Sequence, residues 1–429
     1  MTTHALKVQK TVPHRRWRIA FLLGVGVLVN YFDRVNLSVS HNALIASFGI
    51  TDVIFGYLSS AYSFTYAALQ LPIGVILDKF GVRRTGRIGT FLWSCASFGA
   101  AVTPTLHGLF GARLLLGIGE APTFPANAKA TGHWFPPHER SFATACFDAA
   151  AKLASAVGIP LMGVVLLWAG WRWSFALTGL ISFAYFLLFW RVYREPSEDP
   201  LLTDAERSYI DHIDATNESG NLTAKDHSLF HLITVPKVVG LALGSGAYNY
   251  VFYLLLTWLP TYLSVSLHID LLHSFIYTSV PWLIATATDL LIGGMMVDFL
   301  VRRGANGSRI RRVILVVGTA FGLGIFGAAH AASAAYALFW ISLSIGGLDA
   351  AAPVMWSLPS LIASRPNVGK VGGIINFAGQ ISAICAPIIT GYVVQSQHSY
   401  ALAFCIPAVY LLIGIAGYIF LLGRIELAA

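Results

Sequence analysis

The chain has 429 residues, of which 56% are hydrophobic and only 11% are charged. A soluble domain carries about 25% charged residues, so this composition excludes an ordinary soluble protein and indicates a polytopic membrane protein. The net charge of +8 does not indicate a nucleic-acid partner, because the basic residues gather in short segments between apolar runs, as orienting charges of membrane proteins do.

Apolar runs of the roughly 20 residues needed to cross a bilayer recur along the whole chain. We predict an all-α membrane protein with twelve transmembrane helices in two six-helix bundles. The approximate spans are 17–40, 53–77, 86–105, 108–131, 141–168, 173–193, 236–263, 273–298, 312–331, 335–362, 370–396 and 400–423. The domains are then an N-terminal tail (1–16), a first bundle (17–193), a connection (194–235), a second bundle (236–423) and a C-terminal tail (424–429).

The positions of Lys and Arg predict which side of the membrane each connection faces. Of the 28 Lys and Arg residues, 24 lie in or beside the two tails and the connections that follow even-numbered spans. The other four are Arg34, Arg113, Lys152 and Arg172. Because short basic segments stay in the cytoplasm, we expect both termini and the central connection to be cytoplasmic. Within that connection, the capping-box spacing of Thr203 and Glu206 predicts the start of a short surface helix.

A degenerate repeat relates the two halves. The segment "GVILDKFGVRR" follows the second span, and "GMMVDFLVRRG" follows the eighth, with Asp78 and Asp298 at matching places. Two similar halves around a central site are a known plan for secondary transporters.

The motifs in these segments resemble a known family. Gly74, Asp78, Gly81, Arg83 and Arg84 form a loop signature of the major facilitator superfamily. Finer motifs resemble its anion:cation symporter family, which includes bacterial galactonate, glucarate and hexuronate permeases and vesicular glutamate transporters. These motifs are "NYFDRVN", "RLLLGIGEAPTFPAN", "HWFPPHER", "TWLPTYL" and "INFAGQ", and they occur in order along essentially the whole chain.

The resemblance implies the major facilitator fold and a function. We expect a proton-coupled importer, in a bacterial cytoplasmic (inner) membrane, of an organic carboxylate such as an aldonate, aldarate or uronate. An aromatic or dicarboxylic acid is the alternative substrate. The expected partners are the anion, protons and the lipid bilayer, with no nucleic acid, no metal, no cofactor beyond the coupling proton, and a monomeric state.

Charged residues inside the spans are the first site candidates, because a charge at the bilayer centre costs at least ~2.5–3.5 kcal/mol. Asp33 and Arg34 are adjacent in the first span, where side chains one position apart point about 100° apart, so they need not pair. Arg113 and Glu120 lie two turns apart on one face of the fourth span, about 10 Å along the axis, so each must meet partners elsewhere.

The chemistry of these four residues predicts two roles. A guanidinium presents a fork of donors that suits a carboxylate, so Arg34 and Arg113 are the predicted anion contacts. A carboxyl group in a low-dielectric cavity can titrate as substrate and water come and go, so Asp33 and Glu120 are the predicted proton carriers. The resemblance implies the same assignments, and a structural Arg34 neutralised by Asp33 is the alternative.

Further intramembrane charges leave two interpretations open. Asp148 and Lys152 have i,i+4 spacing, which fits either a self-neutralising helix pair or a third cationic substrate contact tuned by Asp148. For Asp289 and Asp349 we expect backbone or hydroxyl partners, with a functional role as the alternative.

Polar and aromatic residues complete the predicted cavity. The resemblance favours Tyr31, Tyr66 and Asn376 as substrate contacts. Further candidate contacts, which the resemblance favours less, are Tyr253, Trp356, Ser357 and Gln380. The alternative for each is hydrogen bonding between helices.

Two further expectations concern the ends and bends of the spans. Asp78, Arg83 and Arg84 are predicted to form a cytoplasmic gate, with a folding or topology signal as the alternative. Pro122 and Pro125 predict a kink in the fourth span.

Functions of other classes are a membrane enzyme and a transport-silent sensor. The spans show no metal-ligand cluster, no Gly-rich phosphate loop and no nucleophile–His–acid arrangement, and we therefore do not expect an enzyme. The sequence shows no soluble signalling domain that would favour a sensor.

Overall fold

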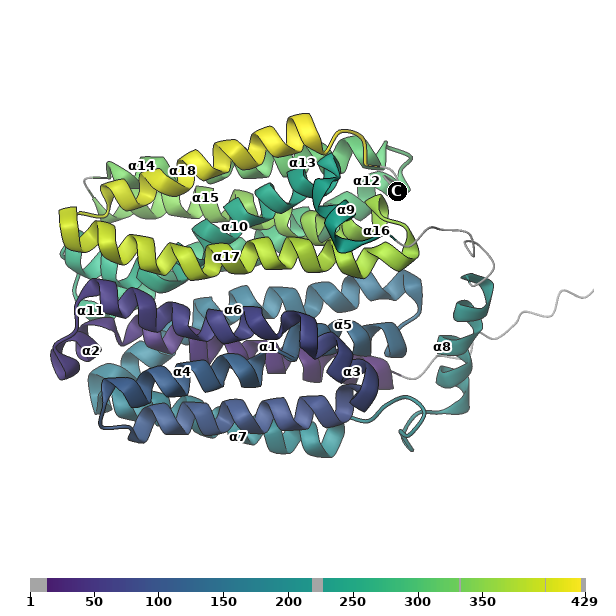
Figure 1. Cartoon of the computed structure of the whole chain (residues 1–429), viewed down its shortest axis with the longest axis horizontal. Coiled ribbons are helices and arrows are strands. Elements are labelled where there is room, and N and C mark those ends of the chain that lie inside the picture. Colours follow the sequence, from purple (N-terminus) through teal and green to yellow (C-terminus); the bar gives the residue numbers. More distant parts are fainter. Residues whose placement is uncertain (1–13, 218–226, 332, 398, 426–429) are drawn as a thin grey trace, which may run out of the picture.

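The structure, a computed structural model, describes residues 14–217, 227–331, 333–397 and 399–425. Within these ranges every regular element is a helix, and the helices form two bundles, one above the other in Figure 1. The N-terminal bundle comprises α1 (Arg15–Val39), α2 (His41–Phe48), α3 (Asp52–Val102), α4 (Leu106–Glu120), α5 (Thr123–Trp134), α6 (Pro137–Ala169) and α7 (Trp171–Val192).

The connection and the second bundle follow. The connection contains α8 (Asp204–Asn217) and α9 (Leu229–Thr234). The C-terminal bundle comprises α10 (Pro236–Thr261), η2 (Tyr262–Ser266), α11 (Leu271–Thr288), η3 (Asp289–Met296), α12 (Val297–Arg302), α13 (Gly307–Gly322), α14 (Ile325–Ala329), α15 (Ala334–Ser357), α16 (Pro359–Ile362), α17 (Arg365–Gln397), α18 (Ala401–Ala416) and η4 (Gly417–Leu421).

Among the described residues, nine helical segments are long and apolar enough to cross a membrane, or ten if α2 and the start of α3 form one bent span. The expected span 53–77 and most of the span 86–105 lie within α3, whose backbone is non-helical at Gly81, where φ is 74° and ψ is 168°. Such a positive φ suits glycine, because it has no Cβ to strain. The count of twelve spans stays a prediction.

The fourth expected span is divided at the predicted place. Helix α4 ends at Glu120 and α5 begins at Thr123, so the break surrounds Pro122, while Pro125 lies within α5. A proline lacks the N–H that would continue the helical ladder, which explains an interruption here. The helix is interrupted where the kink was predicted, and the bend itself stays a prediction.

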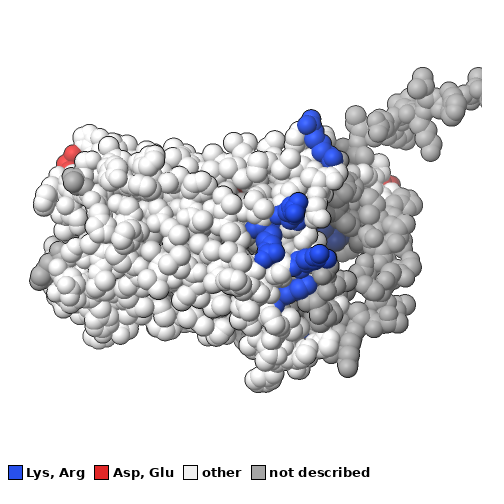
Figure 2. Space-filling view, turned by 90° about the horizontal axis from the view of Figure 1, so that it is seen from above, with Lys and Arg blue, Asp and Glu red and all other residues white. Residues whose placement is uncertain are grey.

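The two ends of the bundles differ in charge. We call the end that carries α8 the α8 end, and the opposite end, which carries α2, the α2 end (Figure 1). On the face shown in Figure 2, Lys and Arg gather toward the α8 end, and the rest of the face is nearly free of charge. Large apolar side chains are exposed along this protein, for example Phe420 at 80% and Val409 at 61%, as a surface facing lipid requires.

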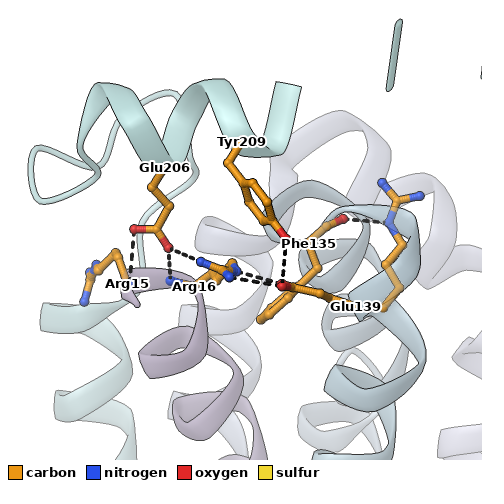
Figure 3. A network of polar contacts seen from close by, with 7 residues as sticks. Arg15, Arg16, Phe135, Glu139, Glu206 and Tyr209 are labelled. Carbon is orange, nitrogen blue, oxygen red and sulfur yellow. Dashed lines mark hydrogen bonds and ion pairs between the residues drawn. The ribbon is translucent and has the colours of Figure 1, made fainter. Parts of the chain in front are cut away.

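Helix α8 is fixed to the start of α1 by its own carboxylate (Figure 3). The buried Glu206 accepts hydrogen bonds from the backbone N–H groups of Arg15 (3.2 Å) and Arg16 (3.1 Å), the first residues of α1. A negative charge there also complements the positive end of the helix dipole. Thr203 Oγ1 accepts from the Glu206 N–H at 3.3 Å, so the predicted start of α8 is confirmed, but Glu206 caps α1 instead of completing its own capping box.

The same region holds α8 through a second carboxylate. Glu139 accepts from Arg16 Nε at 2.7 Å and from the Tyr209 hydroxyl at 3.0 Å, and Asp199 accepts from Arg15 at 2.7 Å (Figure 3 shows the first two contacts). These contacts tie the central connection to the N-terminal bundle.

The two bundles meet closely at the α2 end. Ser38 Oγ donates to the carbonyl oxygen of Thr257 at 2.6 Å, and Ser60 Oγ donates to that of Ile384 at 2.7 Å. A Cβ added at Gly56 would lie 2.6 Å from the carbonyl oxygen of Pro387. Only a glycine therefore permits this approach of α3 and α17, and the two bundles are in direct contact at the α2 end.

Candidate functional site between the two bundles

Asp33 and Arg34 of α1 point to different partners, which their adjacent positions on the helix allow. Asp33 is buried and accepts hydrogen bonds from Ser97 Oγ of α3 at 2.6 Å and Ser182 Oγ of α7 at 2.8 Å. Arg34 instead forms an ion pair with Glu120 of α4, with Nε 3.0 Å from Oε2. The alternative in which Asp33 neutralises Arg34 is wrong for this conformation.

Arg113 and Glu120 face separate partners, as their spacing predicted. Arg113 Nη1 donates to the backbone carbonyl of Asp33 at 3.2 Å, while Glu120 pairs with Arg34. Among the described residues, Arg34 Nη2, Arg113 Nε and Glu120 Oε1 are buried without a hydrogen-bonding partner. Buried polar atoms are normally paired, so these three atoms have capacity for further hydrogen bonds.

Tyrosine rings surround the Arg34 guanidinium. Its Cζ lies 4.4 Å from the ring centroid of Tyr31, 4.7 Å from that of Tyr62 and 5.6 Å from that of Tyr66. Ring faces attract a guanidinium, most strongly where water is excluded. Tyr31 and Tyr66 were predicted, and Tyr62 was missed, although its i,i+4 spacing with Tyr66 on α3 placed the two on one face.

The C-terminal bundle contributes Tyr253 of α10. Its hydroxyl lies 3.4 Å from Arg34 Nη1 and 3.4 Å from the Tyr62 hydroxyl. We call Asp33, Arg34, Arg113, Glu120 and these four tyrosines, Tyr31, Tyr62, Tyr66 and Tyr253, the Arg34 site. It is built mainly by the N-terminal bundle and reaches the C-terminal one through Tyr253.

The other predicted cavity residues of the C-terminal bundle are Asn376, Trp356, Ser357 and Gln380. Asn376 of α17 donates to Gln70 Oε1 of α3 at 2.9 Å, which joins the two bundles. Ser357 Oγ donates to the Val354 carbonyl of its own helix, and Trp356 is 39% exposed. Gln380 is buried. Among the described residues, none of these four side chains forms a hydrogen bond with Arg34, Arg113 or Glu120, and their predicted substrate role stays a prediction.

Lys152 of α6 is the centre of a second charged group. Its Nζ lies 2.6 Å from Asp148 Oδ2 on the same helix, so the predicted i,i+4 pair is present. It also lies 2.6 Å from Asp289 Oδ2 of η3 and 3.8 Å from Asp349 Oδ1 of α15. The Tyr248 hydroxyl of α10 donates to Asp349 Oδ1 at 2.8 Å. We call these five residues the Lys152 cluster.

The Lys152 cluster corrects one expectation. A hydroxyl partner was expected for Asp349 and is confirmed, but for Asp289 the expectation is wrong, because its partner is the Lys152 ammonium. The sequence could not indicate this contact, since it joins helices of different bundles. Lys152 is held by carboxylates here, and its predicted contact with substrate stays a prediction.

The predicted gate residues contact their own bundle and the beginning of the connection. Lys129 Nζ of α5 lies 2.6 Å from Asp78 Oδ1, and the Arg83 N–H donates to Glu195 Oε1 at 3.2 Å. Asp78, Arg83 and Arg84 all line one polar pocket of about 930 Å³ at the α8 end. Burial alone would raise the pKa of the Glu195 carboxyl, but hydrogen bonds from His133 and from the backbone N–H of Arg83 hold it below its ordinary value.

In the described part of the chain, no group of three or more His, Cys, Asp or Glu side chains is arranged to hold a metal ion.

Comparisons with known proteins identify the class. The model of the Major Facilitator Superfamily matches residues 23–384, which is most of the chain. The chain therefore belongs to the Major Facilitator Superfamily, a family of membrane transporters and not of enzymes.

Individual relatives share nearly the full length. The chain is 35% identical over 414 residues to an uncharacterized transporter of Bacillus subtilis (strain 168), covering 96% of this chain and 95% of the relative. It is 32% identical over 422 residues to the D-galactonate transporter of Escherichia coli O6:H1, covering 96% of each. The crystal structure of a bacterial homologue of the human lysosomal transporter Spinster has the same fold, with a TM-score of 0.74 at 16% identity, covering 96% of this chain and 98% of that one.

Proposed function

We propose that this protein is a proton-coupled importer of an organic carboxylate, with a sugar acid as the substrate class. The observation that carries the proposal is the Arg34 site, where two buried arginines keep unpaired donors beside a buried Glu120. The similarity to a D-galactonate transporter supports a sugar acid, and the basic α8 end supports a cytoplasmic position of both termini in a bacterial inner membrane.

The contacts of Glu120 suggest how proton and substrate exchange. In the structure the Glu120 carboxylate forms an ion pair with the Arg34 guanidinium. A substrate carboxylate would bind to the same guanidinium, so the two carboxylates compete for it. Protonation of Glu120 removes the charge that holds Arg34 and so frees the guanidinium for the anion. The substrate and the proton then bind together, which is the condition for symport.

The membrane potential gives the proton its thermodynamic role. Moving one elementary charge across the membrane involves about 2.3 kcal/mol per 100 mV, and a negative interior opposes anion entry. One accompanying proton per carboxylate removes this opposition. Contact between the bundles at the α2 end, with rocking of the two bundles about the Arg34 site, gives the alternating access that such import needs.

Uptake into proteoliposomes tests the proposal. Vesicles containing the purified protein receive radiolabelled D-galactonate or D-glucarate, with an acidic exterior or with equal pH on both sides. We expect accumulation above equilibrium only with the gradient, and none in protein-free vesicles. No gradient-driven accumulation of any of a panel of sugar acids and other carboxylates would overturn the proposal.

An aromatic carboxylate is the second candidate substrate. The four tyrosine rings and hydroxyls of the Arg34 site favour a flat ring beside the guanidinium. Competition of unlabelled benzoate against the sugar acid distinguishes the two. Stronger inhibition by benzoate than by D-galactonate favours the aromatic class.

A further inference from the structure

The Lys152 cluster carries more negative than positive charge inside the protein. Asp148, Asp289 and Asp349 face a single ammonium, so the fully ionised cluster has two uncompensated negative charges. Asp289 and Asp349 have side chains with 0% exposure, and Asp148 has 19%. Each uncompensated ion buried in this way costs several kcal/mol, which protonation of one carboxylate avoids.

Two carboxyl oxygens of the cluster have room for a proton. Asp289 Oδ1 and Asp349 Oδ2 are buried without a hydrogen-bonding partner among the described residues. The other oxygens of these two residues contact Lys152, and Asp349 Oδ1 also accepts from Tyr248. The unpaired oxygens are therefore the atoms that would carry the added proton.

The fold brings the two acids together by close helix packing. Asp289 begins the π-helical segment η3, a type of distortion that is frequent at functional sites. A Cβ at Gly293 of η3 would lie 2.8 Å from the carbonyl oxygen of Ala350 on α15. This glycine allows the close contact that places Asp289 and Asp349 beside the same ammonium.

The other titratable groups around the cluster leave its charge unchanged. Tyr31 of α1 and Tyr248 of α10 are its neighbours from these helices, and both are neutral in their phenol form. Helix α11 offers His273 and Tyr277, which are exposed near its start at the α2 end. The excess negative charge therefore remains with the three aspartates.

We propose that the Lys152 cluster is a further proton-binding site, in which Asp289 or Asp349 of the C-terminal bundle holds at least one proton. Asp289 and Asp349 belong to the C-terminal bundle and Lys152 to the N-terminal one, so this proton weakens a contact that crosses between the bundles. The binding of the proton does not depend on the proposed import, whereas its use in the rocking of the bundles rests on that function.

Infrared spectroscopy of the purified protein in lipid tests proton binding without any substrate. At pH 7 we expect a C=O stretching band from a protonated carboxyl group that is lost in Asp289→Asn or in Asp349→Asn. The exposed Asp270 is the matched control, since its side chain is 63% exposed, and Asp270→Asn should keep the band. An unchanged band in both buried-site variants, with wild-type thermal unfolding, would overturn the proposal.

A variant that should enlarge the protonated-carboxyl band tests the same proposal if the aspartate variants do not fold. Lys152→Met removes the one cation, so we expect a larger protonated-carboxyl band at pH 7 than in the wild type. No increase would overturn the proposal. Because neither spectrum involves a transported solute, the infrared result tests proton binding even if the import proposal fails.

Discussion

The Arg34 site and the Lys152 cluster are two buried charged groups with different composition and placement. The Arg34 site has two arginines and two acids, and its charged members all lie on α1 and α4 of one bundle. The Lys152 cluster has one lysine and three acids, and its contacts join two bundles. The two proposals differ accordingly: in the Arg34 site an anion and the proton of Glu120 exchange places on one guanidinium, whereas in the Lys152 cluster a proton reduces an excess of negative charge between the bundles.

The largest effect expected on substrate binding is at Arg113. Arg113→Ala removes a buried cation and its unpaired donor, and hydrogen bonds to charged groups contribute about 1.5–3 kcal/mol each. We expect affinity for the transported carboxylate to fall by roughly 10- to 100-fold, measured by calorimetry on purified protein. Arg172→Ala, which changes an arginine outside the site, is the control, and retained affinity in Arg113→Ala would contradict the anion contact.

Lys152 should affect stability more than binding. Removing one member of a buried ion pair costs about 3–5 kcal/mol, because the remaining charges are left unpaired. We expect Lys152→Met to lower the unfolding temperature, and to lower it more at pH 8 than at pH 6, since partial protonation reduces the excess negative charge of the buried acids at the lower pH. Thermal unfolding followed by tryptophan fluorescence measures both, and a pH-independent loss would contradict the excess of negative charge.

A smaller loss of folding stability is expected from breaking the contact of α8 with α1, which lies outside both sites. Glu206→Gln weakens a buried acceptor of three hydrogen bonds from Arg15 and Arg16, at a cost of about 1–3 kcal/mol. We expect a lower unfolding temperature with unchanged substrate affinity. The matched control is Glu198→Gln, whose partly exposed pair with Arg83 should contribute less than about 1 kcal/mol. Equal losses in the two variants would refute the role of Glu206.

The smallest effect concerns Glu195 at the α8 end. Because its pKa is lower in the folded protein than its ordinary 4.5, its stabilising contribution is complete above that value and fades as the pH falls through the lowered one. We expect Glu195→Gln to be slightly less stable than the wild type at pH 6, and the difference in stability to narrow steadily as the pH falls below 4.5. A difference that persists at the acid end would contradict this assignment.

Local features of the sequence predicted local features of the structure. The break at Pro122, the start of α8 at Thr203, the divergence of Asp33 and Arg34, and the separation of Arg113 from Glu120 all follow from spacing along one helix. The two-bundle organisation followed from apolar runs and motifs. These properties depend on residues that are close in the chain.

Contacts between distant elements could not be predicted in the same way. Glu206 meets Arg15 across a separation of 191 residues, and Lys152 meets Asp289 across two bundles. Tyr62 joined the Arg34 site because α3 lies beside α1 at one particular rotation. Such partners depend on how helices pack, which the periodicity of a single helix does not contain.

The central claim is that Glu120 carries a proton whose binding frees Arg34 for the anion. The most direct measurement compares Glu120→Gln with the wild type in proteoliposomes, in both pH-gradient-driven accumulation and gradient-free exchange of radiolabelled D-galactonate. A glutamine mimics the protonated acid, so we expect exchange to persist and accumulation to be lost. Gradient-driven accumulation at the wild-type level, or loss of exchange together with accumulation, would contradict the claim.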